Sequence, residues 1–180
     1  MPAFTIEPPA QSEHDPYYYR YIKLVPAGNT SQIMTTQMNE FKKFIGSVPA
    51  EKAGFRYAEG KWSIKEMLGH LIDTERVFMH RALSVARGDE AALAGFDQDD
   101  WCVAGRFDDQ ELDDLLTQWL DVRRAALSML ASLPAGATEK MGHSNGAPIT
   151  VRALVYVPVG HVIYHWDRLV EDYGLADTRG

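Results

Sequence analysis

Two stretches in the first half of the chain repeat apolar residues at the spacing of an α-helix. The first begins near Thr30 and carries an apolar stripe at positions i, i+4, i+8 and i+11, and the segment GSVP (46–49) ends it. The second follows Ser63, a suitable N-cap because a glutamate stands three residues later as its capping-box partner. This second helix is predicted to run to about Arg87, because Gly88 follows it.

The second half of the chain contains two further helical patterns. The third predicted helix begins near Asp109 and ends before Pro134, and its leucines and Trp119 recur on one face. The fourth begins after Thr150 and ends at Gly174. Four long amphipathic helices are typical of a four-helix bundle, so we predict an all-α fold.

The segments outside these helices are not all simple linkers. Residues 1–29 contain several prolines and the run YYYRYI, and we predict an ordered but irregular lead-in. The connections 88–107 and 135–149 are longer than a minimal bundle needs, so we expect them to cover one end of the bundle or to line a site. No stretch predicts a sheet convincingly. The length of 180 residues favours one domain spanning 1–180.

Composition and charge narrow the function classes. The net charge is −7 and the pI about 5.3, without a cluster of Lys or Arg, which argues against nucleic acid or an anionic membrane as the main partner. The single Cys102 excludes an internal disulfide, and no signal-like or membrane-length apolar segment is visible. We therefore expect a cytoplasmic, bacterial-type enzyme or binding protein that acts on small molecules.

Three histidines occupy positions from which they can share a ligand. On a helical wheel His161 and His165 lie about 40° apart, along the inward edge of the apolar face of the fourth helix. His70 lies about 60° outside the apolar edge of the second helix, a border position suited to a side chain that reaches into a cavity. Buried imidazoles need a partner, and a metal ion, a carboxylate or solvent would serve.

The remaining histidines have less favourable positions. His80 falls on the polar side of the second helix and His14 lies in the lead-in, so both are predicted to be solvated. His143 stands in a Gly-rich connection, where a surface loop position is the simplest interpretation and the mouth of a pocket is the alternative.

A His-x-x-x-His pair has a simple metal chemistry. Two neutral imidazoles one turn apart can bind one cation, and a third from a facing helix completes a site that keeps a position open for water or substrate. The residue after His161 is valine, so the H-E-x-x-H pattern of metalloproteases is absent. Spacing alone is a weak signal, and ordinary core or surface histidines are the competing interpretation.

Longer motifs add a family resemblance. The segments KWSIKEMLGHLIDTERVFMHRALSVARGD (61–89), FDQDDW (96–101) and TVRALVYVPVGHVIYHWDRL (150–169) resemble the DinB-like superfamily of DinB/YfiT-like metalloenzymes, and the lead-in is similar as well. The resemblance implies a four-helix bundle in up-down-down-up order with a divalent metal at one end. It implies His70, His161 and His165 as the metal ligands, the same three that the wheel selects.

The resemblance also suggests a reaction class. Relatives include metal-dependent transferases and isomerases that use a low-molecular-weight thiol, in which the metal lowers the pKa of the thiol and so favours the nucleophilic thiolate. The leading hypothesis is a thiol-dependent S-transferase with zinc or nickel, or else iron, manganese, cobalt or copper. The alternatives are a metal-dependent hydrolase, a non-catalytic metal- or small-ligand-binding stress-response protein, and a structural bundle without metal.

Acidic and sulfur-containing side chains are weaker candidates. Asp73, three residues after His70, could assist the metal site or activate a bound water, although the wheel favours an exposed position. Glu75 lies inside the apolar arc and is expected to pair with Arg123 or Arg124 of the third helix. The lone cysteine is expected to be a packed side chain.

Three residues are expected to shape the backbone near the candidate site. Pro158 lies inside the fourth helix, where it removes one hydrogen bond and predicts a kink, and Gly160 adds conformational freedom. Asp97 is predicted to be a loop or capping residue.

Apolar residues in excess of one stripe point to assembly. Trp119, Trp166, Tyr164, Ile163 and Val170 are expected near the surface of the bundle. A helix that is apolar over so wide an arc is either central or buried against a second chain, and we predict a homodimer.

Overall fold

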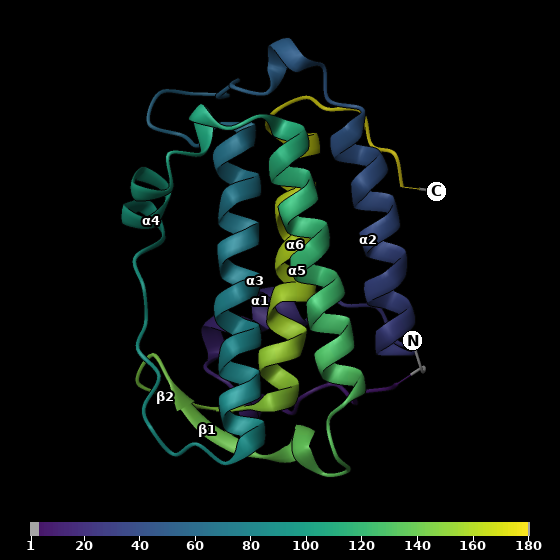
Figure 1. The fold of residues 1–180 in the computed structure, drawn as a ribbon, viewed down its shortest axis with the longest axis vertical. Coiled ribbons are helices and arrows are strands. Elements are labelled where there is room, and N and C mark those ends of the chain that lie inside the picture. The colour runs from purple at the N-terminus through teal and green to yellow at the C-terminus, as the bar shows by residue number, and fades with distance from the viewer. Residues whose placement is uncertain (1–3, 180) are drawn as a thin grey trace.

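The computed structural model describes residues 4–179, and four long helices dominate it (Figure 1). Each of the four predicted helices is present, with ends that differ from the prediction by a few residues. Their bounds are Thr30–Gly46 for α2, Ile64–Arg87 for α3, Leu112–Ala131 for α5 and Val151–Glu171 for α6. The fold is therefore mostly helical. No helix in residues 4–179 combines the length and the apolar character needed to cross a bilayer.

Local chemistry explains where α3 begins and ends. The Ser63 hydroxyl accepts a hydrogen bond from the Glu66 amide at 3.0 Å, and the Glu66 carboxylate accepts one from the Ser63 amide at 2.7 Å. This is the predicted capping box. At the other end Gly88 adopts a left-handed φ of 89°, which lets the chain leave the helix.

The connections carry more structure than the sequence analysis predicted. The lead-in forms α1, Tyr19–Ile22, and the first long connection contains α4, Gln98–Gly105, beside α3 (Figure 1). The Asp97 side chain accepts hydrogen bonds from the amides of Asp99 and Asp100, so its predicted capping role is confirmed. Short 3₁₀ turns occupy further parts of the connections; they are Gln11–Glu13, Pro16–Tyr18, Ala50–Lys52, Phe107–Asp109 and Ala137–Glu139.

The expectation that the chain forms no sheet is wrong. Strands β1, Met141–Ser144, and β2, Ala147–Thr150, pair as an antiparallel hairpin at the lower end of Figure 1. Asn145 and Gly146 join them with φ values of 53° and 80°. An Asn-Gly pair favours such a turn because both positions need a positive φ, and this signal was present in the sequence.

A buried polar network crosses the bundle between two apolar clusters. The Arg123 guanidinium donates to both Glu75 carboxylate oxygens at 2.6 and 2.9 Å and to the Gln37 side-chain oxygen at 2.7 Å. Gln37 in turn donates to the Val159 carbonyl at 2.9 Å. The network joins α2, α3, α5 and α6, and it confirms the predicted pairing of Glu75 with Arg123. On each of the four helices, the residues of one apolar cluster lie on one side of this network and those of the other cluster lie on the opposite side.

Trp119 and Trp166 are not near the surface, contrary to expectation. Trp119 and Trp166 are both buried and pack against the Phe41 ring within the chain. The wide apolar arc of α6 arises because this helix is central: α1, α3 and the hairpin all pack against it. Ile163 and Val170 are half-buried.

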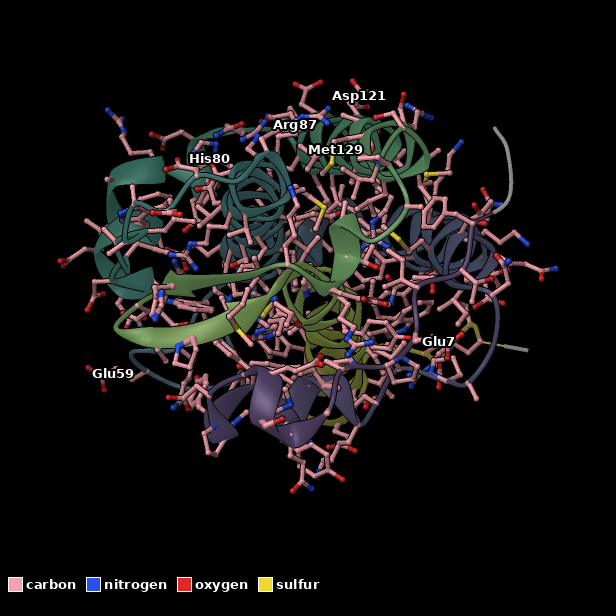
Figure 2. All side chains as sticks on the ribbon, turned by 90° about the horizontal axis from the view of Figure 1, so that it is seen from below. Glu7, Glu59, His80, Arg87, Asp121 and Met129 are labelled. Carbon is pink, nitrogen blue, oxygen red and sulfur yellow. The ribbon has the colours of Figure 1, made fainter. Side chains whose placement is uncertain are left out.

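The three histidines outside the candidate site differ in exposure. His80 is exposed at the outer side of α3, as predicted (Figure 2). His143 is also exposed, but it lies in β1 instead of a loop. The prediction for His14 is wrong: it is buried, because the lead-in packs onto the bundle, and its Nδ1 lies 2.8 Å from the Asp15 carbonyl oxygen.

Candidate metal centre

The structure brings His70, His161 and His165 together. The Nε2 atoms of His70 and His161 are 3.0 Å apart, and those of His165 and His161 are 2.9 Å apart. The three side chains can place one ligand atom each within 4.8 Å of the others, and all three residues are buried. Since 91 positions separate His70 from His161, only the docking of α3 against α6 creates this cluster.

Close backbone contact explains how His161 is enclosed. A Cβ atom on Gly160 would lie 2.0 Å from the Tyr21 carbonyl oxygen, so only glycine allows α1 to pack this tightly on α6. The Tyr21 ring then stands edge-on to His161 with centroids 5.0 Å apart. Gly160 therefore serves close approach instead of the conformational freedom expected from sequence. Helix α6 runs through Pro158 without ending.

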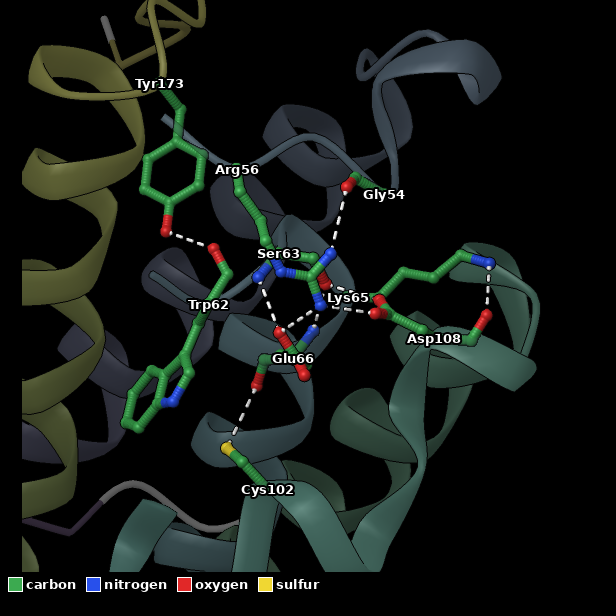
Figure 3. Close-up of polar contacts among 9 residues, drawn as sticks. All are labelled: Gly54, Arg56, Trp62, Ser63, Lys65, Glu66, Cys102, Asp108 and Tyr173. Atoms are coloured by element: carbon green, nitrogen blue, oxygen red, sulfur yellow. Dashed lines mark hydrogen bonds and ion pairs between the residues drawn. The ribbon is translucent and has the colours of Figure 1, made fainter. Parts of the chain in front are cut away.

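Trp62 encloses His70 from the other side. The two rings have centroids 4.6 Å apart. The Trp62 carbonyl accepts a hydrogen bond from the Tyr173 hydroxyl at 2.6 Å, which ties this segment to the residues that follow α6 (Figure 3). Beside it, Arg56 pairs with Asp108 at 2.6 Å, and the same arginine contacts the capping box of α3 (Figure 3). The start of α3, and with it His70, is thus held by polar contacts from both neighbouring connections.

Burial keeps the three imidazoles neutral. It lowers the pKa of His70 to about 4. Burial lowers the pKa of His161 and of His165 well below the ordinary value of 6.5, and the neighbouring imidazoles lower both further. Neutral imidazole is the form that binds a metal, so the cluster is ready for a cation near neutral pH.

The contacts between the rings fit a shared cation better than hydrogen bonding alone. The His161 Nε2 approaches two other ring nitrogens, yet a neutral imidazole nitrogen offers either one proton or one lone pair. Two nitrogens that each bind one ion at about 2.1 Å would lie roughly 3.0–3.4 Å apart for angles between about 90° and 109°. The observed separations of 2.9 and 3.0 Å are close to this range. The donor set therefore fits a divalent ion of the zinc or nickel type.

Two cavities adjoin the histidine cluster from different sides. A cavity of about 400 Å³ is lined by His70 and His161, and it extends along α3 beneath α4 and the hairpin. A second cavity of about 310 Å³ is lined by His165 and Trp62. The α4 residue Asp99 lines both cavities. An ion at the histidines would be reachable from two directions.

Comparison with known proteins identifies the family. The family model described as the DinB superfamily matches residues 33–167, which is most of the chain. This chain belongs to the DinB superfamily. The resemblance seen in the sequence is thereby confirmed, over a range that contains all three histidines. A search of curated proteins gives no significant match.

Solved structures similar to this DinB-superfamily chain agree in fold. YfiT from Bacillus subtilis, described as "a probable metal-dependent hydrolase with an unusual four-helix bundle topology", aligns with a TM-score of 0.71 at 15% identity, covering 96% of this chain and 95% of YfiT. A mycothiol-dependent maleylpyruvate isomerase aligns with a TM-score of 0.66 at 10% identity, covering 82% of this chain and 60% of the isomerase. At these identities the likeness establishes the fold alone.

Within residues 4–179, the other candidate residues from the sequence are not part of the histidine cluster. In the described part of this DinB-superfamily chain, Asp73 lines neither cavity; it is half-buried beside Arg76 at 3.3 Å, and burial raises its pKa. Glu75 is committed to its buried ion pair. Cys102 is buried, and burial raises the pKa of its thiol to about 12, so it is a packed side chain as predicted.

Sequence reasoning missed several residues that line the larger cavity. Tyr18, Thr74, Arg81 and Ser144 were not predicted as site residues, although Arg81 lies within the motif at 61–89. A signal existed for two of them: His70, Thr74 and Arg81 stand at i, i+4 and i+11 on one face of α3. Ser144 gave no such signal, because its place depends on the hairpin.

Proposed function

We propose that this protein is a divalent-metal-dependent enzyme that binds one ion through His70, His161 and His165. The observation that carries the proposal is the convergence of three buried, neutral imidazoles, two of which line a cavity large enough for a small molecule. Three histidines leave coordination positions open, as a catalytic ion requires. Zinc or nickel is the expected ion, with iron, manganese, cobalt or copper as alternatives, because imidazole ligands do not select strongly among them.

The proposed reaction is S-transfer from a low-molecular-weight thiol to an electrophile. When bound, a divalent ion lowers the pKa of a thiol or water molecule that coordinates it. The two cavities on different sides of the cluster favour a reaction with two organic substrates, one reaching His70 and His161 and the other reaching His165. The mycothiol-dependent isomerase among the structural neighbours supports a thiol partner.

Hydrolysis is the second candidate reaction. It is favoured by the neighbour YfiT, described as a probable metal-dependent hydrolase, which this chain matches over nearly its whole length. A hydrolase would need only one organic substrate, with water entering by the other side. A non-catalytic role in binding a metal or small ligand, as in a stress-response protein, is the remaining alternative.

The test replaces each histidine separately. His70→Ala, His161→Ala and His165→Ala should each lose metal, measured by elemental analysis and by Zn²⁺ and Ni²⁺ titration, together with activity. His80→Ala is the matched control, because this histidine is exposed on the same helix as His70. Metal retained at full stoichiometry in all three variants would sink the ligand assignment.

The activity assay separates the candidate functions. Small electrophiles are offered with bacillithiol, mycothiol, glutathione or cysteine, and with water alone. Turnover that needs both thiol and metal supports S-transfer, and metal-dependent turnover without thiol supports hydrolysis. Metal bound at the three histidines without turnover on the panel favours the binding role.

The order of the helices and the assembly are also proposals. We propose the up-down-down-up order within one domain; Figure 1 supports it, since α2 and α6 begin at the lower end and α3 and α5 at the upper end. We also propose a homodimer, supported by the half-buried Ile163 and Val170 on α6. Light scattering that gives a monomer mass over a wide concentration range would refute the dimer.

A further inference from the structure

Arg81 is a buried cation on the wall of the larger cavity. It lies on α3 on the same helix face as His70 and Thr74, so one stripe of side chains leads from the histidine cluster along the cavity. Its residue surface is only 3% exposed. The guanidinium lies near two aromatic rings, with its central carbon 5.2 Å from the Phe78 centroid and 5.9 Å from the Phe96 centroid.

The charge of Arg81 is not neutralised within the described residues 4–179. Arg81 forms no ion pair with a carboxylate there, and its guanidinium donates a hydrogen bond to the Ala94 carbonyl at 2.6 Å. A guanidinium has five N–H groups, and an unpaired buried charge is costly. Burial lowers the pKa of Arg81, and the nearby Tyr18 hydroxyl partly opposes this shift. Such a cation is suited to receive an anion from outside the chain.

Two buried hydroxyl groups on the same cavity also have no hydrogen-bond partner among residues 4–179. The Thr74 Oγ1 and Ser144 Oγ atoms form no hydrogen bond within the part of the chain that the structure describes, and both residues are more than nine-tenths buried. Both line the cavity. A free hydroxyl can donate to an anion, and leaving two such groups unsatisfied is unfavourable unless a ligand completes them.

The acidic residues of the cavity lie at its rim. Asp97 and Asp99 are exposed, and the Asp97 carboxylate is occupied in capping α4. Asp15 is half-buried and caps the turn at Pro16–Tyr18 through its contact with the Tyr17 amide. One cation at the wall and several carboxylates at the rim favour a ligand group with a single negative charge over a doubly charged phosphate.

We infer that this cavity binds a substrate bearing a carboxylate, with Arg81 as its ionic partner and the Thr74 and Ser144 hydroxyls as hydrogen-bond donors. The aromatic rings beside Arg81 then contact the apolar part of the same molecule. The inference rests on the proposed function only in placing the reacting end of the substrate at the histidines. It assigns a substrate class to the cavity, and the binding step itself can be measured without turnover.

The test measures binding of 3-phenylpropionate and of its neutral analogue 3-phenylpropionamide to the full chain by calorimetry. Metal-free and zinc-loaded protein are both used, because a carboxylate could also bind zinc directly. The wild type should prefer the carboxylate in both forms. Arg81→Gln should weaken carboxylate binding roughly tenfold to a hundredfold and leave amide binding nearly unchanged. Thr74→Val and Ser144→Ala should each weaken carboxylate binding roughly two- to tenfold.

Matched variants separate recognition from a structural role. Arg76→Gln removes an exposed arginine of the same helix and should change neither affinity. Arg81→Lys keeps the charge and should keep a preference for the carboxylate, which protects the test if Arg81→Gln folds poorly. Equal loss of both ligands in Arg81→Gln and Arg81→Lys would show that the side chain only holds the loop at Ala94 and would overturn the inference. Absence of carboxylate preference in the metal-free wild type would overturn it too.

The outcome is independent of the metal assignment. If the histidine variants keep their metal but Arg81→Gln loses the carboxylate preference, the proposed function fails while this inference stands. If the histidine variants lose metal and activity but the preference is absent from the wild type, the inference fails alone.

Discussion

Arg123→Met tests whether the polar network across the bundle is essential to its stability. The substitution removes a guanidinium that is fully buried, and it leaves the Glu75 carboxylate, only 2% exposed, without either of its two charged contacts. Gln37 loses a partner as well. Breaking one side of a buried ion pair costs about 3–5 kcal/mol. For a chain of this length each kcal/mol of lost stability lowers the midpoint of thermal unfolding by about 2–4 °C, so we expect this temperature to fall by roughly 6–20 °C.

The assay is urea and thermal unfolding followed by tryptophan fluorescence and circular dichroism. Trp119 is a suitable reporter because the Arg123 guanidinium carbon lies 5.0 Å from the centre of its ring. Arg124→Met is the matched control: it removes an adjacent arginine whose side chain is 53% exposed, and it should change stability by about 0.5 kcal/mol or less.

A second variant separates the lost interaction from the buried charge left behind. Glu75→Leu combined with Arg123→Met removes both charges, and replacement of a buried pair by apolar residues is often neutral or stabilising by about 1–4 kcal/mol. The double variant should therefore be more stable than Arg123→Met alone. The reasoning would be refuted if Arg123→Met lowered the free energy of unfolding no more than Arg124→Met does. It would also be refuted if the double variant lost as much stability as Glu75→Leu and Arg123→Met lose together when each is made alone.

Two further predictions concern the surroundings of the histidines. Gly160→Ala places a Cβ 2.0 Å from the Tyr21 carbonyl oxygen, so α1 must move, and we expect the free energy of unfolding to fall by about 1–3 kcal/mol and metal binding to weaken. Gly46→Ala is the control and should cost nothing measurable, because the space around Gly46 is open. Equal effects of the two substitutions would contradict the packing argument. The free energy of unfolding of the metal-free chain, measured in urea, should fall as pH falls from 6.5 toward about 4, because the unfolded chain binds protons at histidines whose pKa is lowered in the folded state. His70→Leu should make this dependence on pH shallower. A free energy of unfolding that stays constant between pH 7 and 5 would contradict the prediction.

The helices could be predicted because their signals are local. Apolar spacing and the Ser63 capping box located α3 to within a residue, and the 3.6-residue period of α6 placed His161 and His165 on one face. Glu75 was assigned an ion pair because a carboxylate within an apolar arc needs a partner. Each of these inferences uses residues close together in the chain.

The features that were missed depend on contacts between distant segments. His14 is buried because the lead-in packs onto α6, and no pattern within residues 1–29 reveals that. Trp119 was predicted near the surface because it exceeds what one apolar stripe of α5 needs, but α5 packs against both α2 and α3 and Trp119 is buried. The hairpin was a different kind of error, because the Asn145-Gly146 turn signal is local and was overlooked.

One part of the wall of the larger cavity, beside the α3 residues, is built from two loop segments that hold each other: the connection before α4 and the β1–β2 hairpin. Leu93, in the connection before α4, forms a bridge with the hairpin: its amide donates to the His143 carbonyl at 3.0 Å, and its own carbonyl accepts from the Asn145 amide at 2.9 Å. The histidines, by contrast, stand on the helical scaffold. Loops tolerate insertions and substitutions that helices in a packed core do not. Substitutions in these two loops could therefore change which molecules the cavity binds while the arrangement of the three histidines stayed fixed. An exchange of loops between relatives would have to transfer both segments together.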